Sequence, residues 1–252
     1  MAVQDAVENL SLLLPTYELI DTDLLTFLFS NPNKTPDDKP LYIDAATEDV
    51  RTYGDVKQRT RSLAHGLREL GLKPQDIVAF ISPNSIDYPI TCFAVLGCGA
   101  TVSPVSAAYT PTEIQGQLET SGAKYLITHS SLMDHAEKAV LFDPTIKIIQ
   151  ADGNRDKHGK PTAEYLATNF PSNPVVSIKG SEASERLSFM CFSSGTTGRA
   201  KGVMTTHFNL MSNMKQWVLL MPEVTTGEGT NVTFLPFSHI YGLALFVCIG
   251  HW

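Results

Sequence analysis

The sequence has few cysteines and no pattern that would cross-link them or bind a metal. Its 252 residues include four cysteines, none in a CxxC pair, and all four lie inside apolar segments: Cys92, Cys98, Cys191 and Cys248. We interpret them as reduced thiols of a hydrophobic core. The chain also has no HExxH segment. The sequence therefore predicts no metal site built by the protein.

Positive charge and long apolar runs are also scarce. Lys and Arg number 19 against 26 Asp and Glu, which gives a formal net charge of −7 at pH 7. With no basic cluster, we expect neither nucleic acid nor an anionic membrane as a partner. The apolar stretches 89–105 and 241–252 are too short, or too interrupted by Gly and Pro, to span a bilayer. The acidic N-terminus is unlike a secretory signal, which predicts an intracellular protein, cytoplasmic or peroxisomal, and not a secreted one.

The sequence does contain alternating segments typical of strands and helices. We expect strands at 41–43, 76–82, 100–105, 124–129, 146–151, 187–192 and 231–236, and helices at 52–71, 85–99, 110–122, 131–141, 163–168 and 208–221. The 110–122 helix opens on a capping box, Thr110-Pro111-Thr112-Glu113, with proline at the first helical position. Apolar strands each followed by a helix predict an α/β fold: a doubly wound, mostly parallel sheet with helices on both faces.

We expect three regions along the chain. Residues 1–40 read as an irregular segment that ends in a loop rich in Pro, Asn and Asp. Residues 41–205 form the α/β subdomain, in which the polar stretch 152–186 is a crossover with one short helix. Residues 206–252 begin a second α/β subdomain that is incomplete.

One loop, SSGTTGRAKG at 193–202, carries the strongest chemical signal. It combines four hydroxyls, three glycines and two cations directly after a predicted buried strand. Glycines let backbone amides approach an anion, hydroxyls donate hydrogen bonds, and Lys201 adds a point charge, so the loop suits phosphate. A plain flexible turn is the simplest alternative. A Walker loop fits poorly, because Ala200 stands where its second glycine belongs and Gly202 replaces its hydroxyl residue.

The pattern SSGTTGxxKG after an apolar strand resembles the phosphate-binding signature of the adenylate-forming superfamily. This superfamily comprises acyl- and aryl-CoA ligases, luciferases and peptide-synthetase adenylation domains. A second segment, LPFSHIYGL at 235–243, is similar to the superfamily's LPxxHxxG motif. The chain looks most like the 4-coumarate–CoA ligase-like and acyl-CoA ligase members. It departs from them at Ala200, where many carry proline.

The resemblance assigns roles to residues of both motifs. It implies that the ATP phosphates are bound by Ser193, Ser194, Gly195, Thr196, Thr197, Gly198, Lys201 and Gly202. It places His239 in the catalytic site beside the acyl-adenylate, and it makes His239, Tyr241 and Gly242 the border of the acid pocket. In the segment TTHFN, we interpret His207 as a structural residue that caps the following helix.

The resemblance also implies a reaction. ATP activates a carboxylic acid, aromatic or medium-chain, as an acyl-adenylate, and coenzyme A takes the acyl group as a thioester. Mg²⁺ accompanies ATP, but no ligand for it is recognised in this chain. Because superfamily members are longer, we expect an N-terminal part without full activity, whose apolar tail 244–252 lacks covering strands. Two alternatives remain: a non-catalytic nucleotide-binding or dimerisation module, and an unrelated doubly wound domain with a coincidental loop.

Overall fold

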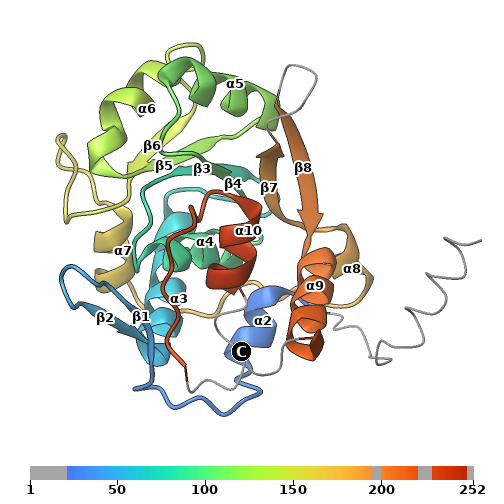
Figure 1. The fold of residues 1–252 in the computed structure, drawn as a ribbon. Coiled ribbons are helices and arrows are strands. Elements are labelled where there is room, and N and C mark those ends of the chain that lie inside the picture. Colours follow the sequence, from blue (N-terminus) through green and yellow to red (C-terminus); the bar gives the residue numbers. More distant parts are fainter. Residues whose placement is uncertain (1–21, 194–199, 221–228, 249–252) are drawn as a thin grey trace, which may run out of the picture.

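A six-stranded sheet forms the centre of the molecule (Figure 1). The computed structural model describes residues 22–193, 200–220 and 229–248. The strands, in the order β6-β5-β3-β4-β7-β8, are β3 (Ile77–Ile81), β4 (Thr101–Val105), β5 (Tyr125–Thr128), β6 (Lys147–Gln150), β7 (Leu187–Ser193) and β8 (Lys201–Thr206). All neighbours pair in parallel except β7 and β8, which are antiparallel. The predicted α/β fold with a mostly parallel sheet is therefore confirmed.

Helices cover both faces of the sheet (Figure 1). One face carries α3 (Tyr53–Glu69), α4 (Tyr88–Gly97) and α7 (Ala163–Asn169), and the other carries α5 (Pro111–Ser121), α6 (Met133–Ala139) and the short η1 (Ser130–Leu132). Successive side chains of a strand point to opposite faces. Accordingly Phe80 in β3 joins the cluster under α3 and α4, whereas Ala79 and Ile81 join the cluster under α5 and α6.

Local sequence signals determine where the helices α3 and α5 begin. At the start of α5, the Thr110 Oγ1 accepts from the Glu113 amide, and the Glu113 carboxylate accepts from the Thr110 amide. Thr52 and Asp55 form the same reciprocal cap at α3. Gly122, at φ +69°, ends α5 in the left-handed conformation that glycine adopts without strain. The capping box predicted from the sequence is confirmed.

The N-terminal part contains a buried helix that the sequence analysis did not predict. Residues 1–40 were expected to be irregular, but α2 (Leu24–Phe29) lies among them, with Leu24 and Leu25 fully buried. The Asp23 carboxylate caps this helix and also accepts from the amide of Ile178. Six residues are too few to show helical periodicity, and such a helix is stabilised by its tertiary contacts. A small antiparallel pair follows it: β1 (Pro40–Ile43) and β2 (Val50–Thr52).

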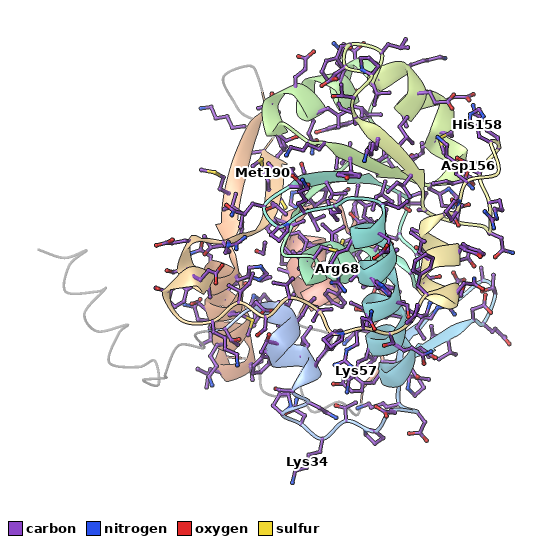
Figure 2. All side chains as sticks on the ribbon, turned by 180° about the vertical axis from the view of Figure 1, so that it is seen from behind. Lys34, Lys57, Arg68, Asp156, His158 and Met190 are labelled. Carbon is purple, nitrogen blue, oxygen red and sulfur yellow. The ribbon has the colours of Figure 1, made fainter. Side chains whose placement is uncertain are left out.

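The crossover 152–186 holds two helices where one was predicted. α7 is the predicted one, and α8 (Ser181–Glu185) is additional. Between them the chain runs past the end of α4, where the Arg68 guanidinium donates to the carbonyls of Gly97 and Pro174 (Figure 2). The first bond ties α3 to the end of α4, and the second ties it to the crossover.

The C-terminal segments pack on the α3–α4 face. They are α9 (His207–Leu220), α10 (Ile240–Gly242) and the π-helical η3 (Leu243–Cys248). Leu243 and Val247 are fully buried in the same cluster as α3 and α4, so the expected exposure of the apolar tail 244–252 is wrong for Val247. The predicted strand at 231–236 is also wrong, because these residues are irregular and Val232 and Phe234 are 83% and 78% exposed. Among the described helices, none has the length and apolar character needed to cross a membrane.

Candidate functional site

The site is built at the edge of the sheet where the parallel strands end. β3, β4, β5 and β7 run in one direction, so their carboxyl ends share one edge. In open α/β sheets ligands bind in crevices at this edge. The phosphate-type loop begins here after β7, and a polar turn with Asn84 begins here after β3.

The described ends of the phosphate-type loop face each other. Ser193, the last residue of β7, is the register partner of Lys201, the first residue of β8. Both are exposed, and Lys201 makes no ion pair with any described residue. The Ser193 hydroxyl and the Lys201 ammonium group therefore flank the loop where it leaves β7 and enters β8. The other predicted phosphate ligands lie outside the described residues: Ser194, Gly195, Thr196, Thr197 and Gly198.

Gly202 lies inside β8 and serves the packing of the hairpin. A Cβ at this position would stand 3.2 Å from the Met190 side chain and 3.2 Å from the Phe192 ring. Met190 belongs to β7, next to β8 (Figure 2). Glycine at 202 thus lets two large β7 side chains lie beside the strand that carries Lys201.

The segment with the second motif is attached to the end of β3. The Asn84 Nδ2 donates to the carbonyl of Leu235 at 2.7 Å, and its Oδ1 accepts from the amide of Phe237 at 2.8 Å. The buried Phe237 ring lies 5.4 Å from Tyr88, which lies 4.4 Å from Phe80 of β3, measured between ring centroids. Only β4 separates β3 from β7, so these two strands lie roughly 10 Å apart across the sheet.

His239, Tyr241 and Gly242 are brought together in one tight turn. The exposed His239 ring caps α10, with its Nδ1 accepting from the Tyr241 amide at 3.3 Å. A backbone N–H only donates, so Nδ1 accepts in this bond, and the tautomer compatible with it carries the ring hydrogen on Nε2. Tyr241 is 51% exposed. Gly242 is buried, and a Cβ there would stand 2.3 Å from the Pro236 carbonyl oxygen.

His207 is buried and is not a helix cap. Thr206 caps α9 instead, since its Oγ1 accepts from the Asn209 amide and the Asn209 Oδ1 accepts from the Thr206 amide. Burial lowers the pKa of His207 to about 4, with Arg186 lowering it further and Asp23 opposing. Its ring nitrogens bond to no described residue. The predicted capping role is therefore wrong.

The described cysteines are core thiols. Cys92, Cys98 and Cys191 are buried and form no disulfide with any described residue, and burial raises the pKa of Cys98 and of Cys191 to about 12. This confirms the prediction of reduced core cysteines for these three. In the described part of the chain, no three His, Cys, Asp or Glu side chains gather as metal ligands would.

Asn84 is the site residue that the sequence analysis missed. The available signal was its place in Pro83-Asn84-Ser85, a polar turn directly after a buried strand, where α/β sheets carry their ligand-binding residues. Nothing local reveals that its partners are Leu235 and Phe237, more than 150 residues away.

Known proteins share both the sequence and the fold. A long-chain-fatty-acid–CoA ligase of Salmonella typhimurium is 30% identical over 245 residues, covering 88% of this chain and 43% of that enzyme. A 4-coumarate–CoA ligase of Arabidopsis thaliana is 30% identical over 235 residues, covering 88% and 40%. The crystal structure of a long-chain-fatty-acid–CoA ligase from Archaeoglobus fulgidus matches the fold with a TM-score of 0.82 at 23% identity, covering 94% and 47%.

The chain thus spans less than half the length of these relatives. The sequence profile of the AMP-binding enzymes matches residues 28–251, which is most of the chain. This agrees with the two motifs at 193–202 and 235–243 and with the placement of both at one sheet edge. The chain belongs to the AMP-binding enzyme family.

Proposed function

We propose that this chain forms part of an AMP-forming acid–CoA ligase, which activates a carboxylic acid with ATP and transfers the acyl group to coenzyme A. One observation carries the proposal. Ser193 and Lys201 open the phosphate-type loop at the same sheet edge to which Asn84 attaches the His239 segment. A triphosphate and a carboxylate must meet in such a reaction, and the two motifs lie where both can be bound.

The loop would bind the phosphates of ATP. A carboxylate that attacks the α-phosphorus approaches a polyanion, so donors and a cation must be in place to offset the charge. At the described ends Ser193 would supply a hydroxyl and Lys201 a cation, and Gly202 would leave room for β8, which carries Lys201. Ser194, Gly195, Thr196, Thr197 and Gly198 complete the proposed set. Mg²⁺ would enter bound to ATP. Among the described residues, no three His, Cys, Asp or Glu side chains lie close enough together to bind it without the nucleotide.

The 235–242 turn would border the acid. His239 is exposed and uses its Nδ1 within the turn, so its Nε2–H could donate a hydrogen bond to a carboxylate or acyl-adenylate oxygen. Tyr241 offers an exposed aromatic ring, and Gly242 leaves room where a side chain would stand. We propose an aromatic or medium-chain acid. The names of the relatives, a long-chain-fatty-acid ligase and a 4-coumarate ligase, support an acid with a large apolar body.

Three finer points belong to the same proposal. ATP and coenzyme A as substrates favour an intracellular location, cytoplasmic or peroxisomal. The domain boundaries, 1–40, 41–205 and 206–252, stay predictions, although α9 and η3 share the buried cluster of α3 and α4. A net charge of −7 supports the expectation that nucleic acid is not a partner.

Two measurements test the function. First, ATP binding is measured by calorimetry for the wild type, for Lys201→Ala and for Lys160→Ala, a control that removes the same charge from an exposed loop beyond β6. We expect Lys201→Ala to weaken binding at least about tenfold, the usual cost of a charge-assisted hydrogen bond, and Lys160→Ala to change nothing.

Second, pyrophosphate release is followed with ATP, coenzyme A and a panel of aromatic and fatty acids. Acid-dependent release supports the ligase. ATP binding without release on any acid would favour the non-catalytic nucleotide-binding module. Equal ATP affinity of Lys201→Ala and Lys160→Ala would contradict the role of the loop in either case.

A further inference from the structure

The attachment of the His239 segment depends on one side chain. The Asn84 amide makes two hydrogen bonds, donating to Leu235 at 2.7 Å and accepting from Phe237 at 2.8 Å. Pro236 between them has no N–H to offer. A neighbouring β-strand would make the same two hydrogen bonds, one to the carbonyl of residue 235 and one to the amide of residue 237. A side chain therefore takes the place of a strand partner here.

The anchor itself has a rigid base. Asn84 follows β3 by three positions, and β3 is buried from Val78 to Ile81. Four positions after Asn84, the fully buried Tyr88 begins α4 and contacts the Phe237 ring. The 235–237 backbone is thus held from two sides, by the Asn84 amide and by the ring contact of Phe237.

Further hydrogen bonds connect the anchored backbone to His239. The His239 amide donates to the Pro236 carbonyl at 3.1 Å, and the Leu243 amide donates to the His239 carbonyl at 2.9 Å. Gly242 lies against the Pro236 carbonyl oxygen, where no Cβ would fit. The turn is closed on Pro236, so a displacement of residues 235–237 displaces the His239 ring with it.

We infer that Asn84 is a positioning residue of the site: through residues 235–237 it sets the place of the His239 ring. The inference rests on the proposed function, in which His239 and the loop after β7 act on the same acyl-adenylate. The inference gives the turn at residues 83–85, which belongs to neither the 193–202 nor the 235–243 motif, a role in that function.

The first test measures the positioning directly, without any activity. Asn84→Ala removes both bonds, whereas Asn84→Asp keeps an acceptor for the Phe237 amide but loses the donor to Leu235. Ser85→Ala is the matched control in the same turn, because its hydroxyl bonds to no described residue. NMR on the full chain records amide exchange at Phe237 and the ¹⁵N shifts of the His239 ring.

In Asn84→Ala we expect Phe237 amide exchange to accelerate about fivefold or more and the single His239 tautomer to be lost. The Phe237 exchange rate of Asn84→Asp should fall between those of the wild type and Asn84→Ala. Ser85→Ala should have the exchange rate and the His239 shifts of the wild type. Protected β3 and β4 amides in every variant show that the fold is intact. Identical Phe237 exchange and His239 shifts in Asn84→Ala and Ser85→Ala would overturn the inference.

The second test connects positioning to binding and separates the inference from the proposed function. An acyl-sulfamoyl adenosine, a stable mimic of an acyl-adenylate, should bind Asn84→Ala about tenfold more weakly than Ser85→Ala, while affinity for ATP alone changes less than about twofold. Equal affinity of both variants for the mimic would overturn the positioning role. If the wild type binds neither ATP nor the mimic, the proposed function fails, whatever the NMR result.

Discussion

The two halves of the sheet differ in how deeply they are buried. β4 and β5 are buried at every position and β3 at all but its first, whereas β8 has no buried residue, with Val203 53% and Met204 66% exposed. The residues assigned to chemistry lie in or beside the open half and on the turns at its edge. Burial of apolar surface supplies most of the stability of a fold. The comparison indicates that the β3–β4–β5 half stabilises the molecule. In the other half β7 is buried from Ser188 to Cys191, so the exposure comes from β8, and the proposed site lies at this end of the sheet.

The largest expected effect is a loss of core packing. Phe93 on α4 is fully buried, so Phe93→Ala should lower the free energy of unfolding by about 3–5 kcal/mol. Met204→Ala on β8 removes an exposed side chain and should change it by less than about 0.5 kcal/mol. Urea unfolding followed by circular dichroism measures both. Comparable losses would contradict the proposed division between the two halves.

The second effect is a pH dependence that originates at His207. Its pKa is about 4 in the folded protein against 6.5 for the free side chain, so the unfolded chain binds the proton more readily. The stabilisation is complete above pH 6.5 and is lost as the pH falls toward 4, by up to about 3 kcal/mol. Unfolding in urea at pH 7, 5.5 and 4.5 should show this decline.

His207→Gln should reduce this pH dependence, because glutamine has no proton to bind in this range. The control is His158→Gln, which changes an exposed side chain in the loop beyond β6 (Figure 2). It should leave the decline as in the wild type. A decline that survives unchanged in His207→Gln would show that other groups cause it.

The third effect is a pair of glycine substitutions that should change stability in opposite directions. A Cβ at Gly242 would stand 2.3 Å from the Pro236 carbonyl oxygen, so Gly242→Ala should destabilise the turn by about 1–3 kcal/mol and speed Phe237 amide exchange. At Gly116 in α5, a Cβ would meet nothing within 4 Å, so Gly116→Ala should stabilise by about 0.5–1 kcal/mol. Thermal unfolding and hydrogen exchange measure both, and changes of the same sign would refute the steric argument.

The smallest expected effect is that of a thiol reagent on two buried cysteines, Cys98 at the end of α4 and Cys191 in β7. At pH 8 a thiol with a pKa of about 12 is almost wholly protonated, and only the thiolate reacts. Cys98 and Cys191 should therefore remain unmodified by Ellman's reagent in the native protein and react once urea unfolds it. Mass spectrometry of the digested protein identifies the modified cysteines, and rapid native labelling of either would show that its half of the sheet opens readily.

Local chemistry was sufficient for much of this molecule. The strands β3, β4, β5 and β7 were predicted because they are apolar and bounded by turns, and α3 and α5 because of their periodicity and capping residues. The loop at 193–202 was recognisable because phosphate binding needs glycines, hydroxyls and a cation close together in sequence. These features depend on residues within a few positions of one another, which a single sequence displays.

Tertiary structure decided the rest. α2 is helical because Leu24 and Leu25 are buried, and where a strand was predicted at 231–236 the backbone of Leu235 instead bonds to the Asn84 side chain. His207 is neutral because it is enclosed, a property that its neighbours in sequence do not reveal. The sequence by itself indicated a loop suited to phosphate and five of the six strands of the sheet, all but β8. Contacts between residues some 150 positions apart decided how His239 is attached beside that loop, since such contacts form only when the chain has folded.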